Sequence, residues 1–167
     1  MRVSATKVIS ASPERIFTLL TDPGQHPLID GTGSVLAVQP GGPERLTLGA
    51  RFGMDMKIGA PYKILNEVVE YDQDRLIAWR HFNGHRWRWQ LRPLEDGTTE
   101  VTETFDWSTA RIPLLITLSR FPRRNARGIE RSLDRLADLV GGRTDLDRRT
   151  WGGGSGAPLR GSARPGT

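Results

Sequence analysis

Two ionisable side chains, Glu103 and His81, occupy positions where the surrounding pattern is apolar. In the predicted strand 99–107, Glu103 alternates with Val101 and Phe105, so these side chains share one face. A carboxyl on an apolar face either has a raised pKa or contacts a cation. A pair of Glu103 with His81 would serve general acid–base chemistry, whereas an arginine on a neighbouring strand would form a structural salt bridge. Glu103 and His81 are therefore the catalytic candidates.

The same alternation predicts an aromatic and methionine-rich lining around these two groups. Every second residue of several predicted strands is large and apolar, and the predicted C-terminal helix adds further apolar residues. The candidates for a ligand-binding cavity are Phe52, Met54, Met56, Ile77, Trp79, His81, Trp87, Trp89, Glu103, Phe105, Ile129 and Leu133. Plain core packing is the alternative to ligand contact, because methionine adapts to either role. A shift of one residue in register would move the whole set to the opposite face.

The remaining chemistry-bearing residues point to no cofactor. His26 and His85 fall in predicted loops, where we expect them to be solvated, and Asp55 would face inward only if the methionine face pointed outward. Three scattered histidines and no cysteine make no recognisable metal site. No phosphate-binding loop, dinucleotide fingerprint or nucleophile elbow occurs. We therefore expect neither a metal nor a cofactor.

The elements that position these residues are mainly antiparallel strands. The connections DQD, NG and EDG are too short for helical crossovers, which predicts a meander. The first hairpin is expected to join Ser34–Gln39 to Arg45–Leu48. The other predicted strands cover residues 2–10, 51–58, 62–71, 75–82, 85–94 and 99–107.

Predicted helices precede and follow the meander in the sequence. Ser12 and Pro13 predict the start of a short helix, and a second short turn or helix follows at 25–30. Apolar residues at three- and four-residue steps predict a long helix over Arg123–Val140, which Gly141-Gly142 should end. One helix cannot fill the concave face of a strongly curved sheet, so we expect a cavity between them.

Three stretches resemble a known superfamily. They read VISASPERIF (8–17), VVEYDQDRLIAWR (68–80) and HRWRWQLRPLEDGTTEVTETFDW (85–107). They are similar to the START-like (SRPBCC) superfamily and, within it, to the bacterial polyketide cyclase/dehydrase and lipid-transport group. The resemblance implies an α+β helix-grip fold, in which six to seven strands wrap around a long C-terminal helix. It also implies a cavity for a small hydrophobic or amphipathic molecule, lipid- or polyketide-like.

The composition predicts one domain and a tail. Residues 1–140 suit a single core, whereas 141–167 are rich in Gly, Ser, Pro and Arg and are expected to be a disordered tail. The tail contributes +3 of the net charge of +5, through five arginines against two aspartates. The charge of the domain therefore predicts no specific nucleic-acid binding.

Localisation and partners follow from what the sequence lacks. It has no cysteine, no apolar N-terminal core typical of a signal peptide, and its longest apolar run, Ile112–Leu118, is too short to cross a membrane. We expect a cytoplasmic monomer or weak homodimer with at most peripheral membrane contact. A row of arginines on the last helix and its approach is either a solvated face or a contact for acidic headgroups: Arg120, Arg123, Arg124, Arg127, Arg131 and Arg135.

Three functions remain open at this point. The first is a module that carries or senses an apolar ligand, and the second is a cyclase or dehydratase that uses the same cavity. The third is an interaction protein whose basic tail and helix meet an acidic partner or a membrane. An enzyme needs at least two convergent polar groups in the pocket, and the sequence offers one carboxyl and one histidine, so ligand binding is favoured.

Overall fold

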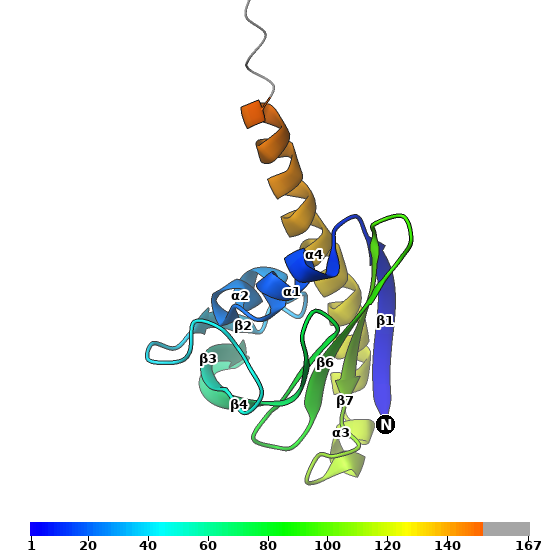
Figure 1. The fold of residues 1–167 in the computed structure, drawn as a ribbon. Helices are drawn as coiled ribbons and strands as arrows, with labels where there is room; N and C mark the ends of the chain where they lie inside the picture. Colours follow the sequence, from blue (N-terminus) through cyan, green and yellow to red (C-terminus); the bar gives the residue numbers. More distant parts are fainter. Residues whose placement is uncertain (152–167) are drawn as a thin grey trace, which may run out of the picture.

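A computed structural model describes the backbone of residues 1–151 and the side chains of residues 1–141. Seven antiparallel strands form one sheet in the order β1-β7-β6-β5-β4-β3-β2 (Figure 1). The strands are β1 (Arg2–Ile9), β2 (Val35–Val38), β3 (Arg51–Ile58), β4 (Ala60–Asp72), β5 (Leu76–Arg80), β6 (Arg86–Pro93) and β7 (Thr99–Asp106). The helices are α1 (Pro13–Leu20), the short 3-10 helix η1 (Pro23–Gln25), α2 (His26–Ile29), α3 (Pro113–Leu118) and α4 (Phe121–Trp151). The α+β helix-grip architecture is as predicted.

The register of the sheet places Glu103 among apolar neighbours. On β7, Val101, Glu103 and Phe105 are all buried, so the inward face of this strand is the predicted one. Glu103 lies opposite Ala5 on β1 and Trp89 on β6. The carboxyl is thus fixed on the core face by the two-residue period of the strand.

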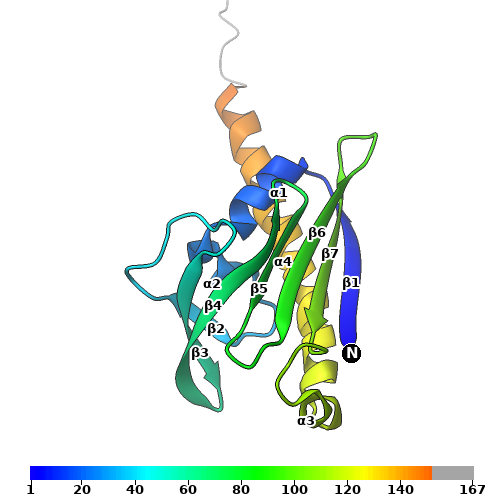
Figure 2. The same cartoon turned by 60° about the horizontal axis from the view of Figure 1, so that its bottom comes forward.

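Helix α4 crosses the inner face of the sheet and contacts β1 and β7 (Figure 2). Ile129, Leu133, Leu136 and Val140 are buried on its inner side, at the spacing of one apolar stripe. No helix in the described part of the chain combines the length and the hydrophobicity that crossing a bilayer requires.

Two of the predicted elements are wrong: the end of the last helix and the strand Arg45–Leu48. Helix α4 continues through Gly141-Gly142 to Trp151, because Gly141 does not adopt the left-handed φ by which a glycine ends a helix. The rest of the predicted tail, from residue 152 on, lies outside the described residues. Arg45–Leu48 is not a strand: the backbone N–H of Leu46 donates to Thr21 O (2.8 Å) at the end of α1, and β2 pairs with β3 instead.

Candidate functional site

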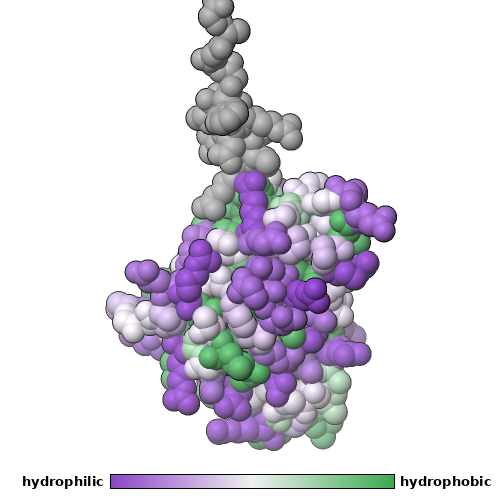
Figure 3. All heavy atoms as spheres, viewed as in Figure 1, coloured by the Kyte–Doolittle hydropathy of each residue, from purple (hydrophilic) through white to green (hydrophobic). Residues whose placement is uncertain are grey.

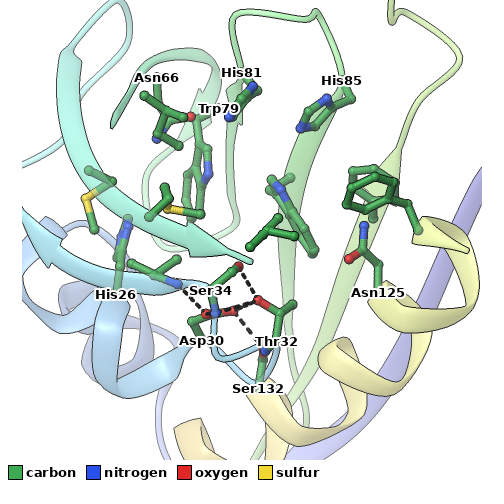
Figure 4. Close-up of a pocket in the computed structure, with 18 of the residues that line it drawn as sticks. His26, Asp30, Thr32, Ser34, Asn66, Trp79, His81, His85, Asn125 and Ser132 are labelled. Carbon is green, nitrogen blue, oxygen red and sulfur yellow. Dashed lines mark hydrogen bonds between the residues drawn. The ribbon is translucent and has the colours of Figure 1, made fainter. Parts of the chain in front are cut away.

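A cavity of about 310 Å³ lies between the inner face of the sheet, helix α2, the segment Asp30–Ser34 and the start of α4 (Figure 4). Several predicted residues line it: Met54, Met56, Trp79, His81, Trp87, Trp89, Glu103 and Phe105. Its volume is in the range of small-molecule sites. Three other lining side chains, Ile58, Phe82 and Phe121, are exposed to solvent, and we call these three the mouth of the cavity.

Four predicted cavity residues are buried but do not line the cavity: Phe52, Ile77, Ile129 and Leu133. The ring of Phe52 packs edge-on against Trp79 at 5.8 Å, and Ile77 lies beside Trp89 in the core. The residues of α4 that line the cavity are Phe121, Asn125 and Ser132. These four are therefore core residues.

The sequence analysis missed the polar segment that closes one end of the cavity. The Asp30 carboxylate accepts hydrogen bonds from Thr32 N (2.9 Å), Thr32 Oγ1 (2.6 Å), Ser34 N (2.7 Å) and Val35 N (2.8 Å), some of which Figure 4 draws as dashed lines. We call Asp30–Ser34 together with Ser132 the floor of the cavity. An aspartate followed by Thr and Ser at two-residue steps is typical of such a turn and was the available signal.

Two glycines let the floor contact helix α4 backbone to backbone. A Cβ on Gly31 would lie 2.2 Å from Gly128 O, and a Cβ on Gly128 would lie 2.5 Å from the Thr32 side chain. Hydrogen bonds fix this approach: Gly31 N donates to Ser132 Oγ (2.9 Å), and the Arg131 guanidinium donates to Gly31 O (2.7 Å). The floor is thus a rigid part of the helix–sheet junction.

Glu103 is the buried carboxyl of the cavity wall, and its environment differs from that of Asp30. Its Oε2 atom has no hydrogen-bond partner, and within residues 1–141 no cation lies at ion-pair distance. The predicted arginine salt bridge is wrong because Arg86 and Arg88 alternate with the inward tryptophans and pair with Glu70 on the other face.

Burial raises the pKa of Glu103 well above its ordinary value, and the negative charge of Asp30 raises it further. The Ser132 hydroxyl opposes this shift, but its proton is also directed to Gly128 O (3.1 Å). The protonated form of Glu103 is therefore favoured.

His81 and His85 stack at the other end of the cavity, with ring centroids 4.6 Å apart. The Nδ1 atoms of both rings are buried without a hydrogen-bond partner. Burial lowers the pKa of each to about 4, and for His81 the neighbouring His85 adds to this. Both rings are thus neutral at neutral pH, and the expectation that His85 is solvated is wrong because its loop folds over Phe105.

His26 is likewise buried rather than solvated, because α2 turns it inward. Its Nε2 contacts Leu20 O at 2.9 Å, and its ring stacks on Trp79 at 4.8 Å. Burial lowers the pKa of His26, while the Leu20 carbonyl and two nearby aspartates oppose the shift. Asp55 faces away from the cavity and accepts a hydrogen bond from Gln39 Nε2 (2.9 Å).

The cavity wall contains no cationic side chain among the described residues, although the chain holds 24 lysines and arginines. No ion pair or hydrogen bond links His81 to Glu103 there, so the predicted acid–base pair is not assembled. Residues 1–141 also hold no cluster of three or more His, Cys, Asp or Glu side chains suited to a metal ion. Outside the floor, the wall offers apolar surface with a few polar atoms that lack a partner.

The comparisons with known proteins agree with this architecture. A family model described as polyketide cyclase / dehydrase and lipid transport matches residues 1–141. An uncharacterised Mycobacterium tuberculosis protein, Rv0088, is 35% identical over 145 residues, covering 82% of this chain. The chain spans 63% of the length of the curated relatives it matches.

Two solved structures share the fold. Protein MLL2253 from Mesorhizobium loti superposes with a TM-score of 0.65 at 17% identity, covering 87% of this chain and 100% of that one. The AHSA1-like protein from Aeromonas hydrophila gives 0.63 at 20% identity, covering 86% and 94%. Such identities establish the fold alone. With the family match over residues 1–141, the chain belongs to the polyketide cyclase / dehydrase and lipid-transport family of the START-like superfamily.

Proposed function

We propose that the protein binds a small, largely apolar molecule in this cavity, as a carrier or sensor. The observation that carries the proposal is a cavity of about 310 Å³ whose wall includes Trp79, Trp87, Trp89 and two methionines. Aromatic side chains provide large contact areas, and methionine adapts to irregular partners.

The polar atoms of the wall restrict the chemistry of the ligand. A carboxylate or phosphate inside the cavity would be buried without a cation, which is strongly unfavourable. A protonated Glu103 can instead donate a hydrogen bond to a carbonyl or hydroxyl oxygen, and the histidine Nδ1 atoms offer further uncharged partners. We therefore propose an uncharged ligand that carries a hydroxyl or carbonyl group.

Matched aromatic probes test this preference. Quenching of the cavity tryptophans should show 2-naphthol binding at one equivalent, and 2-naphthoate at the same pH should bind at least about tenfold more weakly. Met54→Trp, which fills the cavity, should weaken 2-naphthol, whereas Leu65→Trp on the exposed face should not. Equal or tighter binding of the carboxylate would contradict the proposed ligand class.

Native mass spectrometry of the freshly expressed protein tests the function more directly. A co-purified molecule of uncharged, oxygen-containing chemistry that Met54→Trp excludes would support the proposal. A bound anionic molecule that survives in that variant would speak against it.

One observation favours a second candidate, a cyclase- or dehydratase-type enzyme. Glu103, whose pKa is raised and whose Oε2 atom has no partner, is a candidate general acid. No base contacts it among the described residues, so we place binding first. Glu103→Gln separates the two: an enzyme keeps ligand affinity and loses turnover of a true substrate, whereas a carrier changes in affinity alone.

A further inference from the structure

Helix α3 and the residues beside it expose an unusual amount of apolar side chain. Ile112, Leu114, Leu115, Leu118 and Phe121 have exposed fractions between 42% and 78%, and we call these five residues the apolar ridge. No residue of α3 is buried. In Figure 3 hydrophobic side chains gather at the lower right, where α3 lies in Figure 1. Contiguous exposed apolar surface of this kind marks an interaction site.

The ridge is fixed to the domain. The Trp107 Nε1–H donates to Thr117 Oγ1 (2.8 Å), which links α3 to the end of β7. The backbone N–H of Arg111 donates to Asn83 O (2.9 Å), which links the ridge to the turn that carries Phe82. The ridge is therefore presented in one orientation, next to the cavity mouth.

Arginines surround the ridge without acidic partners. The segment 107–129 contains five arginines and no Asp, Glu or Lys. These are Arg111, Arg120, Arg123, Arg124 and Arg127. Within residues 1–141 none of the five forms an ion pair, whereas the sheet arginines Arg86 and Arg88 both pair with Glu70. Their charge is thus available to an anionic surface.

Phe121 belongs both to the ridge and to the mouth, and Phe82 and Ile58 complete the mouth. A surface covering the ridge would therefore also cover the entrance of the cavity. The partner must accept leucines that project from the surface and arginines that are scattered around them, without a groove or a charge pattern of its own that matches them. A fluid bilayer with anionic headgroups meets both conditions, because it needs no shape complementarity.

We propose that the apolar ridge docks the protein on anionic lipid bilayers, with the leucines at the headgroup–acyl boundary and the arginines on lipid phosphates. Apolar burial combined with a basic patch is the pairing of signals that gives stable peripheral attachment. Docking places the cavity mouth against the lipid, so a ligand can enter without crossing water. The docking itself does not depend on the proposed ligand binding.

Flotation of the full chain with vesicles of phosphatidylcholine, with and without phosphatidylglycerol, tests the proposal. Partitioning should require phosphatidylglycerol and weaken as salt increases. Leu114→Ser with Leu118→Ser should reduce the partition coefficient at least about tenfold, and Arg120→Gln about fivefold. The matched controls, Leu48→Ser with Leu65→Ser and Arg75→Gln, change equally exposed residues elsewhere and should bind like the wild type.

The outcomes discriminate between partners. If the serine variant floats like the wild type, the ridge is not the anchor and the proposal fails. It also fails if the wild type does not float but self-associates in sedimentation in a way that the serine variant abolishes, because the ridge is then a contact between two copies. Binding of an acidic polypeptide but not of vesicles overturns it as well. Met54→Trp should still float, which separates a failure of docking from a failure of ligand binding.

Discussion

The floor and the rest of the cavity wall use their polar groups in opposite ways. At the floor, Asp30 accepts four hydrogen bonds from its own segment. Elsewhere in the cavity wall, Glu103 Oε2 and the Nδ1 atoms of His81 and His85 have no partner. A buried polar group that is satisfied stabilises the fold, whereas an unsatisfied one is destabilising and available. The floor is thus structural, and the wall is where a ligand can form new hydrogen bonds.

The largest effect should come from the contact beneath the floor. Gly31→Ala places a Cβ 2.2 Å from Gly128 O, which is backbone and cannot move aside without shifting α4. We expect a loss of about 4 kcal/mol in the free energy of unfolding, in the range of severe strain. Gly42→Ala is the control, because its Cβ would meet nothing closer than 3.9 Å and its φ is not positive. Urea unfolding that gives equal midpoints for both variants would contradict the rigid floor.

Core and cavity positions should differ next. Leu133→Ala opens a void in closed packing and should cost about 3 kcal/mol. Met56→Ala merely enlarges an existing cavity, so we expect about half that loss. Denaturation curves of the two variants measure both losses. A larger loss for Met56→Ala than for Leu133→Ala would mean that Leu133, rather than Met56, lines the cavity.

The two carboxyls provide the sharpest contrast. Asp30→Asn replaces a carboxylate that accepts four hydrogen bonds by an amide. The NH2 group of this amide would face N–H donors that it cannot accept from, so about 2 kcal/mol should be lost. Glu103→Gln replaces a carboxyl whose Oε2 atom has no partner by a neutral isostere, and we expect less than about 1 kcal/mol to be lost at pH 7. Thermal unfolding of both variants measures the difference; a larger loss for Glu103→Gln would mean that the carboxyl has a partner.

A further contrast concerns pH slopes of opposite sign. The pKa of His81 and His85 is lowered from 6.5 to about 4, so their contribution is full above pH 6.5 and is lost as pH falls toward 4. Wild type should lose stability there relative to His81→Phe with His85→Phe, by up to about 1.4 kcal/mol per pH unit for each histidine. The pKa of Glu103 is raised, so its contribution is full below pH 4.5 and is lost at higher pH. Glu103→Gln should therefore gain on wild type as pH rises, and parallel stability curves would contradict both shifts.

The parts of the site that follow a local period were predictable from the sequence. Alternation on β7 is enough to put Glu103 on the same face as Val101 and Phe105. The short connections between the strands are enough to predict the meander. The floor was not predictable, because Gly31 and Gly128 lie far apart in the sequence and neither has a side chain that signals a contact. His85 was misplaced for a similar reason: its burial depends on the turn folding over Phe105, not on its neighbours in sequence.

The contact between Gly31 and Gly128 also determines when the core can close during synthesis of the chain. The last strand of the sheet ends at Asp106, but the floor is closed only when Gly128, Arg131 and Ser132 are present. A nascent chain that has emerged as far as β7 therefore displays the tryptophans of its inner face to solvent. Chains exposing such surface are prone to aggregate, so truncation before α4 should yield an insoluble product rather than a smaller binding module.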